Sequence, residues 1–165
     1  MKAFMTNGTL NFLKSLNKKH PNIHFYFMNN GTSTVVYYEG NHKNVFSSGR
    51  TYNVLTSKGD IQDKGFIVMN NIPVAEEEHP VFEDRFKNRQ NGVETMPGFQ
   101  AFRLLSPAKG NTYIVLTQWA SEQDFENWKK SDQFAKAHQE KTTKPPAYFL
   151  ERPFITSYQM IDPDQ

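Results

Sequence analysis

The chain of 165 residues contains no cysteine, which excludes disulfide bonds and leaves histidine, carboxylate and tyrosine side chains as possible metal ligands. It has no apolar run long enough to span a bilayer, and its first residues lack the apolar core of a secretory signal. No lysine- and arginine-rich block is interleaved with aromatic residues, so no nucleic-acid-binding surface is expected. We therefore expect a cytoplasmic protein that does not act on a membrane or on nucleic acid.

Several catalytic signatures are also missing. The sequence contains no G-x-S-x-G, P-loop or G-x-G-x-x-G pattern, and no pair of acidic residues stands out from the surface carboxylates. Five histidines are present, but none are paired at the spacing typical of zinc sites. These absences disfavour common hydrolases, nucleotide-binding enzymes and zinc enzymes.

The composition is that of a chain with a substantial core. Hydrophobic residues make up 37% of the sequence and aromatic residues 14%, with 14 phenylalanines. The 19 basic and 17 acidic side chains nearly balance, which leaves a formal net charge of +2. A chain of this length and composition is expected to fold as one compact domain or as one domain with a smaller attachment.

The second half of the chain predicts a ferredoxin-like domain. Its apolar patterns alternate between the periods of strands and helices in the order β-α-β-β-α-β. The predicted strands are 66–74, 98–105, 112–119 and 149–160, and the predicted helices are 76–89, 122–129 and 132–139.

The first half gives a partial echo of that order. A strand at 2–6, a helix at 9–16 and strands at 23–28 and 33–38 are predicted, with a hairpin turn at Asn29-Asn30-Gly31. Weaker strand patterns occur at 45–46 and 52–55. We expect an α+β protein with an N-terminal part, 1–64, and a ferredoxin-like domain of the dimeric α/β-barrel type, 65–165. The two sheets are predicted to pack face to face as a pseudo-dimer.

His138 and Trp128 are candidates for a binding site near the end of the chain. His138 follows Phe134 by four residues and therefore lies on or beside an apolar helix face. It is either a core histidine bonded to a backbone carbonyl or a neutral imidazole available to iron. Trp128 is either a packing anchor or a ligand contact. A straight helix would separate the two by about 15 Å, but Ser131 predicts a break between them.

Asn70 and Asn71 interrupt an apolar strand pattern. Because successive strand residues face opposite sides, one amide is expected to point inward. A buried amide without a partner costs about 1–3 kcal/mol. The inward amide therefore marks either an irregular or edge position of the sheet or a hydrogen-bond donor for a ligand.

Residues 66–138 resemble the IsdG-type heme-degrading monooxygenases, a branch of the antibiotic biosynthesis monooxygenase fold. With its N-terminal part included, the chain resembles the bacillar HmoB subgroup of that family. The resemblance is carried by the order and spacing of several short segments. These segments are Asn70-Asn71-Ile72, Phe82-Glu83-Asp84-Arg85-Phe86, residues 93–99, residues 119–125, Trp128, and residues 131–138.

The resemblance implies an enzyme that opens heme oxidatively and releases iron, with O₂ and an external electron donor such as an unidentified reductase. Heme would then be both substrate and cofactor. His138 would be the axial ligand of the iron, Trp128 would press on the porphyrin, and Asn70 would hydrogen-bond near the oxygen site. Phe86, on the apolar face of the helix predicted at 76–89, is expected to contact heme as well.

Two departures from the simpler members of the family are visible. Those members have an Asn-Arg pair where this chain has Asn70-Asn71, which leaves Arg85 and Arg89 as candidates to neutralise the heme propionates. The simpler members are homodimers, whereas residues 1–64 are expected to cover the exposed sheet face and make this chain a monomer. Two non-catalytic alternatives remain: a signalling role like that of the staphylococcal TRAP proteins, which share the two-part architecture, and heme storage.

Overall fold

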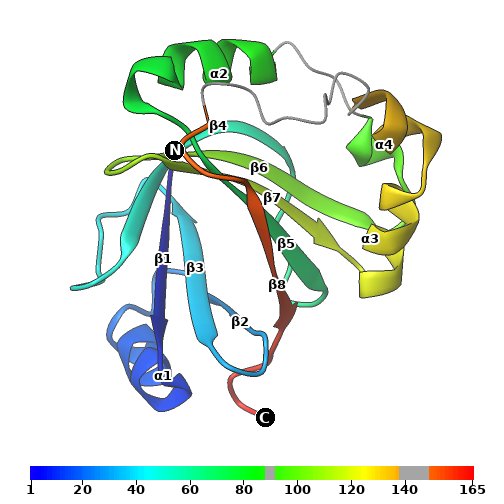
Figure 1. The fold of residues 1–165 in the computed structure, drawn as a ribbon. Helices are drawn as coiled ribbons and strands as arrows, with labels where there is room; N and C mark the ends of the chain where they lie inside the picture. Colours follow the sequence, from blue (N-terminus) through cyan, green and yellow to red (C-terminus); the bar gives the residue numbers. More distant parts are fainter. Residues whose placement is uncertain (88–91, 138–148) are drawn as a thin grey trace.

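The computed structural model describes residues 1–87, 92–137 and 149–165. Within these ranges the strands form one closed antiparallel barrel, with the helices outside it (Figure 1). The strands are β1 (Lys2–Gly8), β2 (Tyr26–Asn29), β3 (Thr34–Gly40), β4 (Arg50–Gly59), β5 (Phe66–Pro73), β6 (Phe99–Pro107), β7 (Thr112–Trp119) and β8 (Phe154–Met160). The helices are α1 (Leu10–Lys19), α2 (His79–Lys87), α3 (Glu122–Lys129) and α4 (Asp132–Ala137), and short 3₁₀ turns lie at Glu76–Glu78 and Val93–Thr95.

The strand order around the barrel is β1-β3-β2-β8-β5-β7-β6-β4. The predicted ferredoxin-like sequence of elements is confirmed, because β5, α2, β6, β7, α3–α4 and β8 follow one another along the chain. Its four strands adjoin in the order β8-β5-β7-β6, and the N-terminal strands adjoin in the corresponding order β4-β1-β3-β2.

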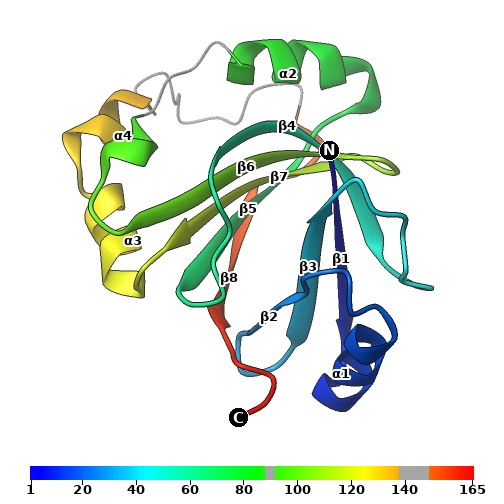
Figure 2. The same ribbon diagram turned by 180° about the vertical axis from the view of Figure 1, so that it is seen from behind.

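The face-to-face packing of the two sheets as a pseudo-dimer stays a prediction, and the structure adds that their edges are joined. β4 pairs with β6 over seven registered positions, and β2 pairs with β8 at Met28 and Asn29 (Figure 2). Joining the edges satisfies backbone groups that two open sheets would leave unpaired.

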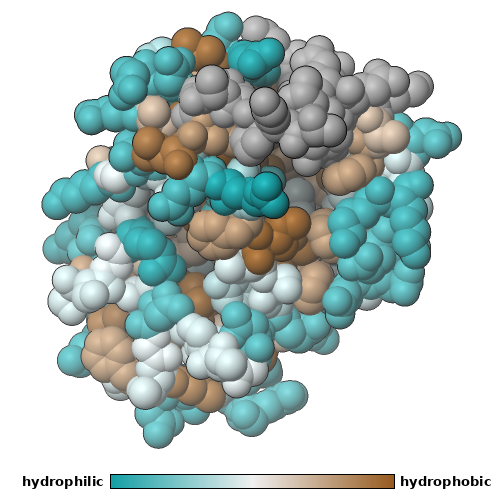
Figure 3. Space-filling view, viewed as in Figure 1, coloured by the Kyte–Doolittle hydropathy of each residue, from teal (hydrophilic) through white to brown (hydrophobic). Residues whose placement is uncertain are grey.

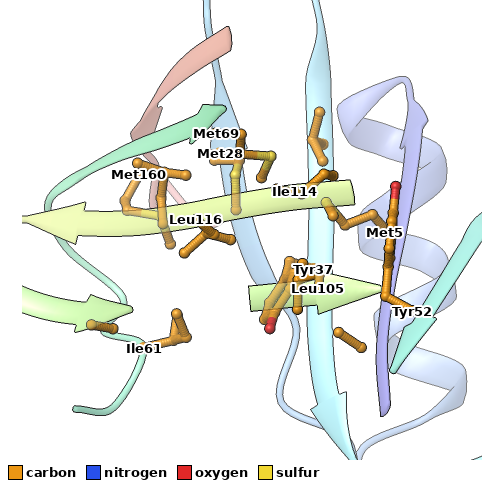
Figure 4. Close-up of a cluster of buried hydrophobic side chains, with 14 residues drawn as sticks. Met5, Met28, Tyr37, Tyr52, Ile61, Met69, Leu105, Ile114, Leu116 and Met160 are labelled. Atoms are coloured by element: carbon orange, nitrogen blue, oxygen red, sulfur yellow. The ribbon is translucent and has the colours of Figure 1, made fainter. Parts of the chain in front are cut away.

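The barrel interior is filled by apolar side chains from both halves of the chain, including Met5, Met28, Met69 and Met160 (Figure 4). This interior contains one charged pair. Arg103 of β6 donates to both carboxylate oxygens of Glu39 on β3, each at 3.0 Å, and the Tyr37 hydroxyl donates to the same carboxylate. Burial disfavours the charged Arg103, but the hydrogen bonds and charge of Glu39 outweigh it and raise the pKa of the guanidinium.

The chain passes from β4 to β5 through residues 60–65, which are held by side chains of the C-terminal half. The buried amide of Gln118 accepts from Gln62 N at 2.7 Å and donates to Gln62 O at 2.8 Å. Ile61 reaches into the barrel core. This crossing adjoins the boundary predicted between residues 64 and 65, and the division into two domains stays a prediction.

Several predicted elements differ from those observed. Residues 45–46 form no strand, because Tyr38 Oη and Asn44 Oδ1 accept the backbone N–H groups of Val45 and Phe46 in place of a neighbouring strand. β4 is ten residues long where only a weak four-residue pattern was visible. β8 begins at Phe154 rather than 149, and Phe149 makes only an isolated bridge with Val74.

The helices begin and end largely as their sequences predict. The Thr9 hydroxyl caps α1 by accepting from Phe12 N at 3.2 Å, and α3 has the predicted bounds. Phe12 itself is 54% exposed, because the buried face of α1 is centred on Leu13. No helix in the described ranges has the length and apolar character needed to cross a bilayer.

Candidate functional site

Two apolar clusters lie between the outer face of the C-terminal strands and helices α2, α3 and α4. One cluster contains Trp119 and Trp128 from β7 and α3, and the other contains Phe82 of α2 and Tyr113 of β7. Three partly buried side chains contact both clusters and therefore mark their junction. These side chains are Leu55, Phe86 and Val115.

Asn70 lies on β5 at this junction. Side-chain alternation places it on the same outer face as Val68 and Ile72, which belong to the first and the second cluster respectively. It is directly opposite Val115 on one side and Ile155 on the other. Among the described residues its side-chain amide has no hydrogen-bond partner, so both its donor and its acceptor remain available.

Asn71 points to the other side of the sheet, where its amide nitrogen has acceptors on its own strand and on β8. Its amide nitrogen lies 3.2 Å from each of three acceptors: Met69 O, Phe154 O and Thr156 Oγ1. The two neighbouring asparagines therefore differ sharply, and the one chosen from the sequence is the one that faces the helices.

Trp128 lies near the end of α3, where the predicted break is confirmed. The Ser131 hydroxyl donates to Trp128 O at 2.7 Å and accepts from Phe134 N at 3.1 Å, which ends α3 and starts α4. The indole of Trp128 stacks on Trp119 at 6.3 Å between centroids and meets the edge of Phe134 at 5.6 Å. It is only 5% exposed, so contact with a ligand requires neighbouring side chains to move.

Phe86 is carried by α2, which is anchored on the sheet by residues that the sequence did not single out. The Tyr113 hydroxyl donates to Glu83 Oε2, and burial together with this hydrogen bond raises the pKa of Tyr113. His79 Nε2 donates to Val74 O at 3.1 Å and its ring meets Tyr113 edge-on. These contacts fix the position of Phe86 at the cluster junction.

The remaining predicted site residues are placed as follows. His138, the predicted iron ligand, lies outside the described residues, immediately after the last residue of α4. Arg85 is on the exposed side of α2, and Arg89 lies outside the described residues. In the described part of the chain, no three histidine or acidic side chains gather as a metal-binding group.

The site thus combines apolar side chains on the outer face of the strands, aromatic side chains packed around them, and the side-chain amide of Asn70. Figure 3 shows apolar side chains gathered over β5 and β8 on this face of the molecule. A surface of this kind can hold a large, flat, mainly apolar molecule and give it a single directed hydrogen bond. Sequence patterns could not identify Val115 or Ile155 as neighbours of Asn70, because they come from two other strands.

Comparison with known proteins gives a family match within the C-terminal half of the chain. Residues 65–140 match the antibiotic biosynthesis monooxygenase family. A heme-degrading monooxygenase of Listeria monocytogenes is 29% identical over 130 residues, which cover 79% of this chain and 78% of that protein. The signal transduction protein TRAP of Staphylococcus aureus is also 29% identical, over 133 residues covering 81% of this chain and 80% of TRAP.

Solved structures share the fold over nearly the whole chain. A structure of a major regulator of staphylococcal pathogenesis has a TM-score of 0.85 at 24% identity, covering 98% of this chain and all of the other. The heme-degrading enzyme LmHde of Listeria monocytogenes has a TM-score of 0.70 at 24% identity and the same coverage. Identities this low establish only a common fold. The activity of this chain has to be inferred from its own site residues.

Proposed function

We propose that this chain is a heme-degrading monooxygenase. The match of residues 65–140 to the antibiotic biosynthesis monooxygenase family supports this proposal. The observation that carries the proposal is the free amide of Asn70 within an otherwise apolar surface. Heme is a flat, mainly apolar macrocycle with a central iron and two propionates, and this surface with its single amide fits the macrocycle. The similarity to the listerial heme-degrading monooxygenase over most of both chains supports the same reading.

Each site residue has a distinct part in this proposal. Bound heme would supply an iron atom that activates O₂, with electrons from an external donor. His138 would hold the iron through a neutral imidazole nitrogen. Asn70 would donate a hydrogen bond beside the oxygen site, and Phe86 would line the pocket from α2. Opening of the macrocycle would release the iron.

Trp128 is proposed to press on one side of the macrocycle. Its stacking on the fully buried Trp119 supports this part, because a ring backed by another ring resists displacement. A rigid indole could distort a softer porphyrin, which would help oxygen add to the ring.

We further propose that residues 1–64 take the place of a second protomer, so that the protein is a monomer. The repeated strand order, β4-β1-β3-β2 and β8-β5-β7-β6, supports this reading. On the outer face of the N-terminal half, aromatic side chains such as Phe4, Phe25 and Tyr38 pack on one another. One heme per chain is therefore expected.

Size-exclusion chromatography with light scattering is expected to give a mass near the chain mass of 19.1 kDa, because the barrel closes within one chain. The measurement should be made with and without hemin. A mass twice as large in the absence of hemin would contradict the proposed replacement of a second protomer.

Addition of hemin is expected to give a saturable Soret shift at one heme per chain, followed by Soret decay and iron release once ascorbate is added in air. Catalase should be present to remove free peroxide. His138→Ala is expected to abolish the shift, because the axial nitrogen is lost. The matched control is His24→Ala, an exposed histidine 2.6 Å from Asp63 in the N-terminal half, which should titrate like wild type.

Other outcomes of this titration favour other functions. Tight binding with a stable Soret band would indicate heme storage or delivery. Absence of saturable binding would favour a non-catalytic signalling role, the second candidate, which rests on the equal 29% identity to TRAP. An unchanged spectrum in His138→Ala would remove that residue as the iron ligand.

A further inference from the structure

Ile155 of β8 is an aliphatic side chain that the fold leaves in water. It is 58% exposed, the most exposed of the large hydrophobic residues in the described part of the chain. Its neighbours do not explain this exposure, because β8 is paired with β5 over this stretch and the strand continues for five more residues. Isolated apolar residues on a surface are common, so the exposure of Ile155 alone does not indicate a function. Its position next to the candidate site does.

That position is directly opposite Asn70 in the β5–β8 ladder. Side chains opposite each other in antiparallel strands share a face, with Cβ atoms about 4.5–5.5 Å apart. Ile155 therefore stands on the outer face beside the free amide. Val115 is opposite Asn70 on the other side, so three adjacent strands present one row: Ile155, Asn70 and Val115.

The row has a simple chemical consequence. The side chains of Val115 and Ile155 cannot form hydrogen bonds with the side-chain amide of Asn70. Both also displace water from beside that amide. An amide between two branched aliphatic side chains is directed away from the sheet, toward whatever lies over the row. A ligand covering this row would be held by apolar contact on both sides of one hydrogen bond.

We infer that Ile155 contacts the bound heme and, with Val115, sets which edge of the macrocycle lies against Asn70. This inference rests on the proposed function and adds a residue of the last strand to the site. Val115 is already half-buried against the clusters of α2 and α3, whereas Ile155 becomes covered only when the ligand binds. Ile155 should therefore affect heme affinity more than it affects folding.

Ile155→Ala is expected to weaken hemin binding about tenfold in Soret titrations, because apolar surface covered by the ligand is removed. Ile155→Val, which loses one of the three carbon groups that Ile155→Ala removes, is expected to weaken it about twofold. The thermal unfolding midpoint of the ligand-free protein should stay close to wild type in both variants. The distribution of ring-opened isomers should also change in Ile155→Ala, because the macrocycle can rotate over the row.

Phe154→Ala is the matched control. Phe154 is the preceding residue of β8 and is 51% exposed, but it lies opposite Asn71 and so points to the other side of the sheet. Its replacement should leave hemin affinity and product distribution unchanged. Equal losses in both variants would indicate a general disturbance of β8 and would overturn the inference.

The outcomes also separate this inference from the function on which it rests. If wild type binds hemin and Ile155→Ala binds it equally well, Ile155 does not contact the ligand and the inference is wrong. If wild type shows no saturable binding, the proposed function itself fails. A lowered unfolding midpoint for ligand-free Ile155→Ala, without a change in affinity, would assign the residue to the fold alone.

Discussion

Asn70→Ala is expected to slow the opening of the heme ring about 100-fold while hemin affinity stays within about threefold of wild type. The amide is the polar group that faces the helices from the outer side of β5, and its flanking residues Val115 and Ile155 offer no substitute donor. A hydrogen bond aimed at charge that develops during the reaction affects the rate more than ground-state binding. Single-turnover Soret decay with hemin prebound measures this rate directly.

Asn71→Ala provides a control of the same residue type at the adjacent position. Its amide is engaged with Met69 O, Phe154 O and Thr156 Oγ1 on the other side of the strand. We expect a lower unfolding midpoint and an unchanged rate of Soret decay. Equal rates in wild type and Asn70→Ala would remove Asn70 from the reaction, whatever the effect of the control.

Glu39→Ala is expected to lower the free energy of unfolding by about 3 kcal/mol, because Arg103 would be left as a buried charge without its partner. Arg103 is 3% exposed and the Glu39 side chain 16%. The guanidinium also donates to Lys58 O, Gly59 O and Phe102 O, so it cannot easily turn toward solvent. Urea denaturation followed by far-UV circular dichroism measures the change.

The exposed ion pair between Lys58 and Glu94 supplies the comparison. Its nitrogen–oxygen distance is 3.2 Å, but the two side chains are 36% and 42% exposed. Glu94→Ala should cost less than about 1 kcal/mol, since water screens the pair. If Glu39→Ala and Glu94→Ala lowered the free energy of unfolding by similar amounts, burial of Arg103 would not be the cause of the loss in Glu39→Ala.

Local patterns in the sequence were enough to predict much of the fold. The bounds of α3 and β7, the Thr9 cap and the break at Ser131 follow from hydrophobic period and capping chemistry within a few residues. These features depend on neighbours in the chain. Alternation along β5 likewise predicts that Asn70 and Asn71 face opposite sides, but it does not tell which of them faces the helices.

Features set by contacts between distant segments could not be predicted. The register that brings Ile155 beside Asn70 joins residues 85 positions apart, and no local pattern encodes it. The length of β4 depends on pairing with β1 and β6, which overrides a weak strand pattern. The burial of Trp128 against Trp119 likewise depends on how α3 meets the sheet.

The closure of the barrel within one chain has a consequence for assembly. A barrel built from two separate chains forms and dissociates by mass action, so dilution would weaken it. Here the contacts of β4 with β6 and of β2 with β8 join segments of one polypeptide, and residues 60–65 keep the halves at a fixed effective concentration. The integrity of the fold is therefore independent of how much of the protein a cell contains, even at a few copies per cell.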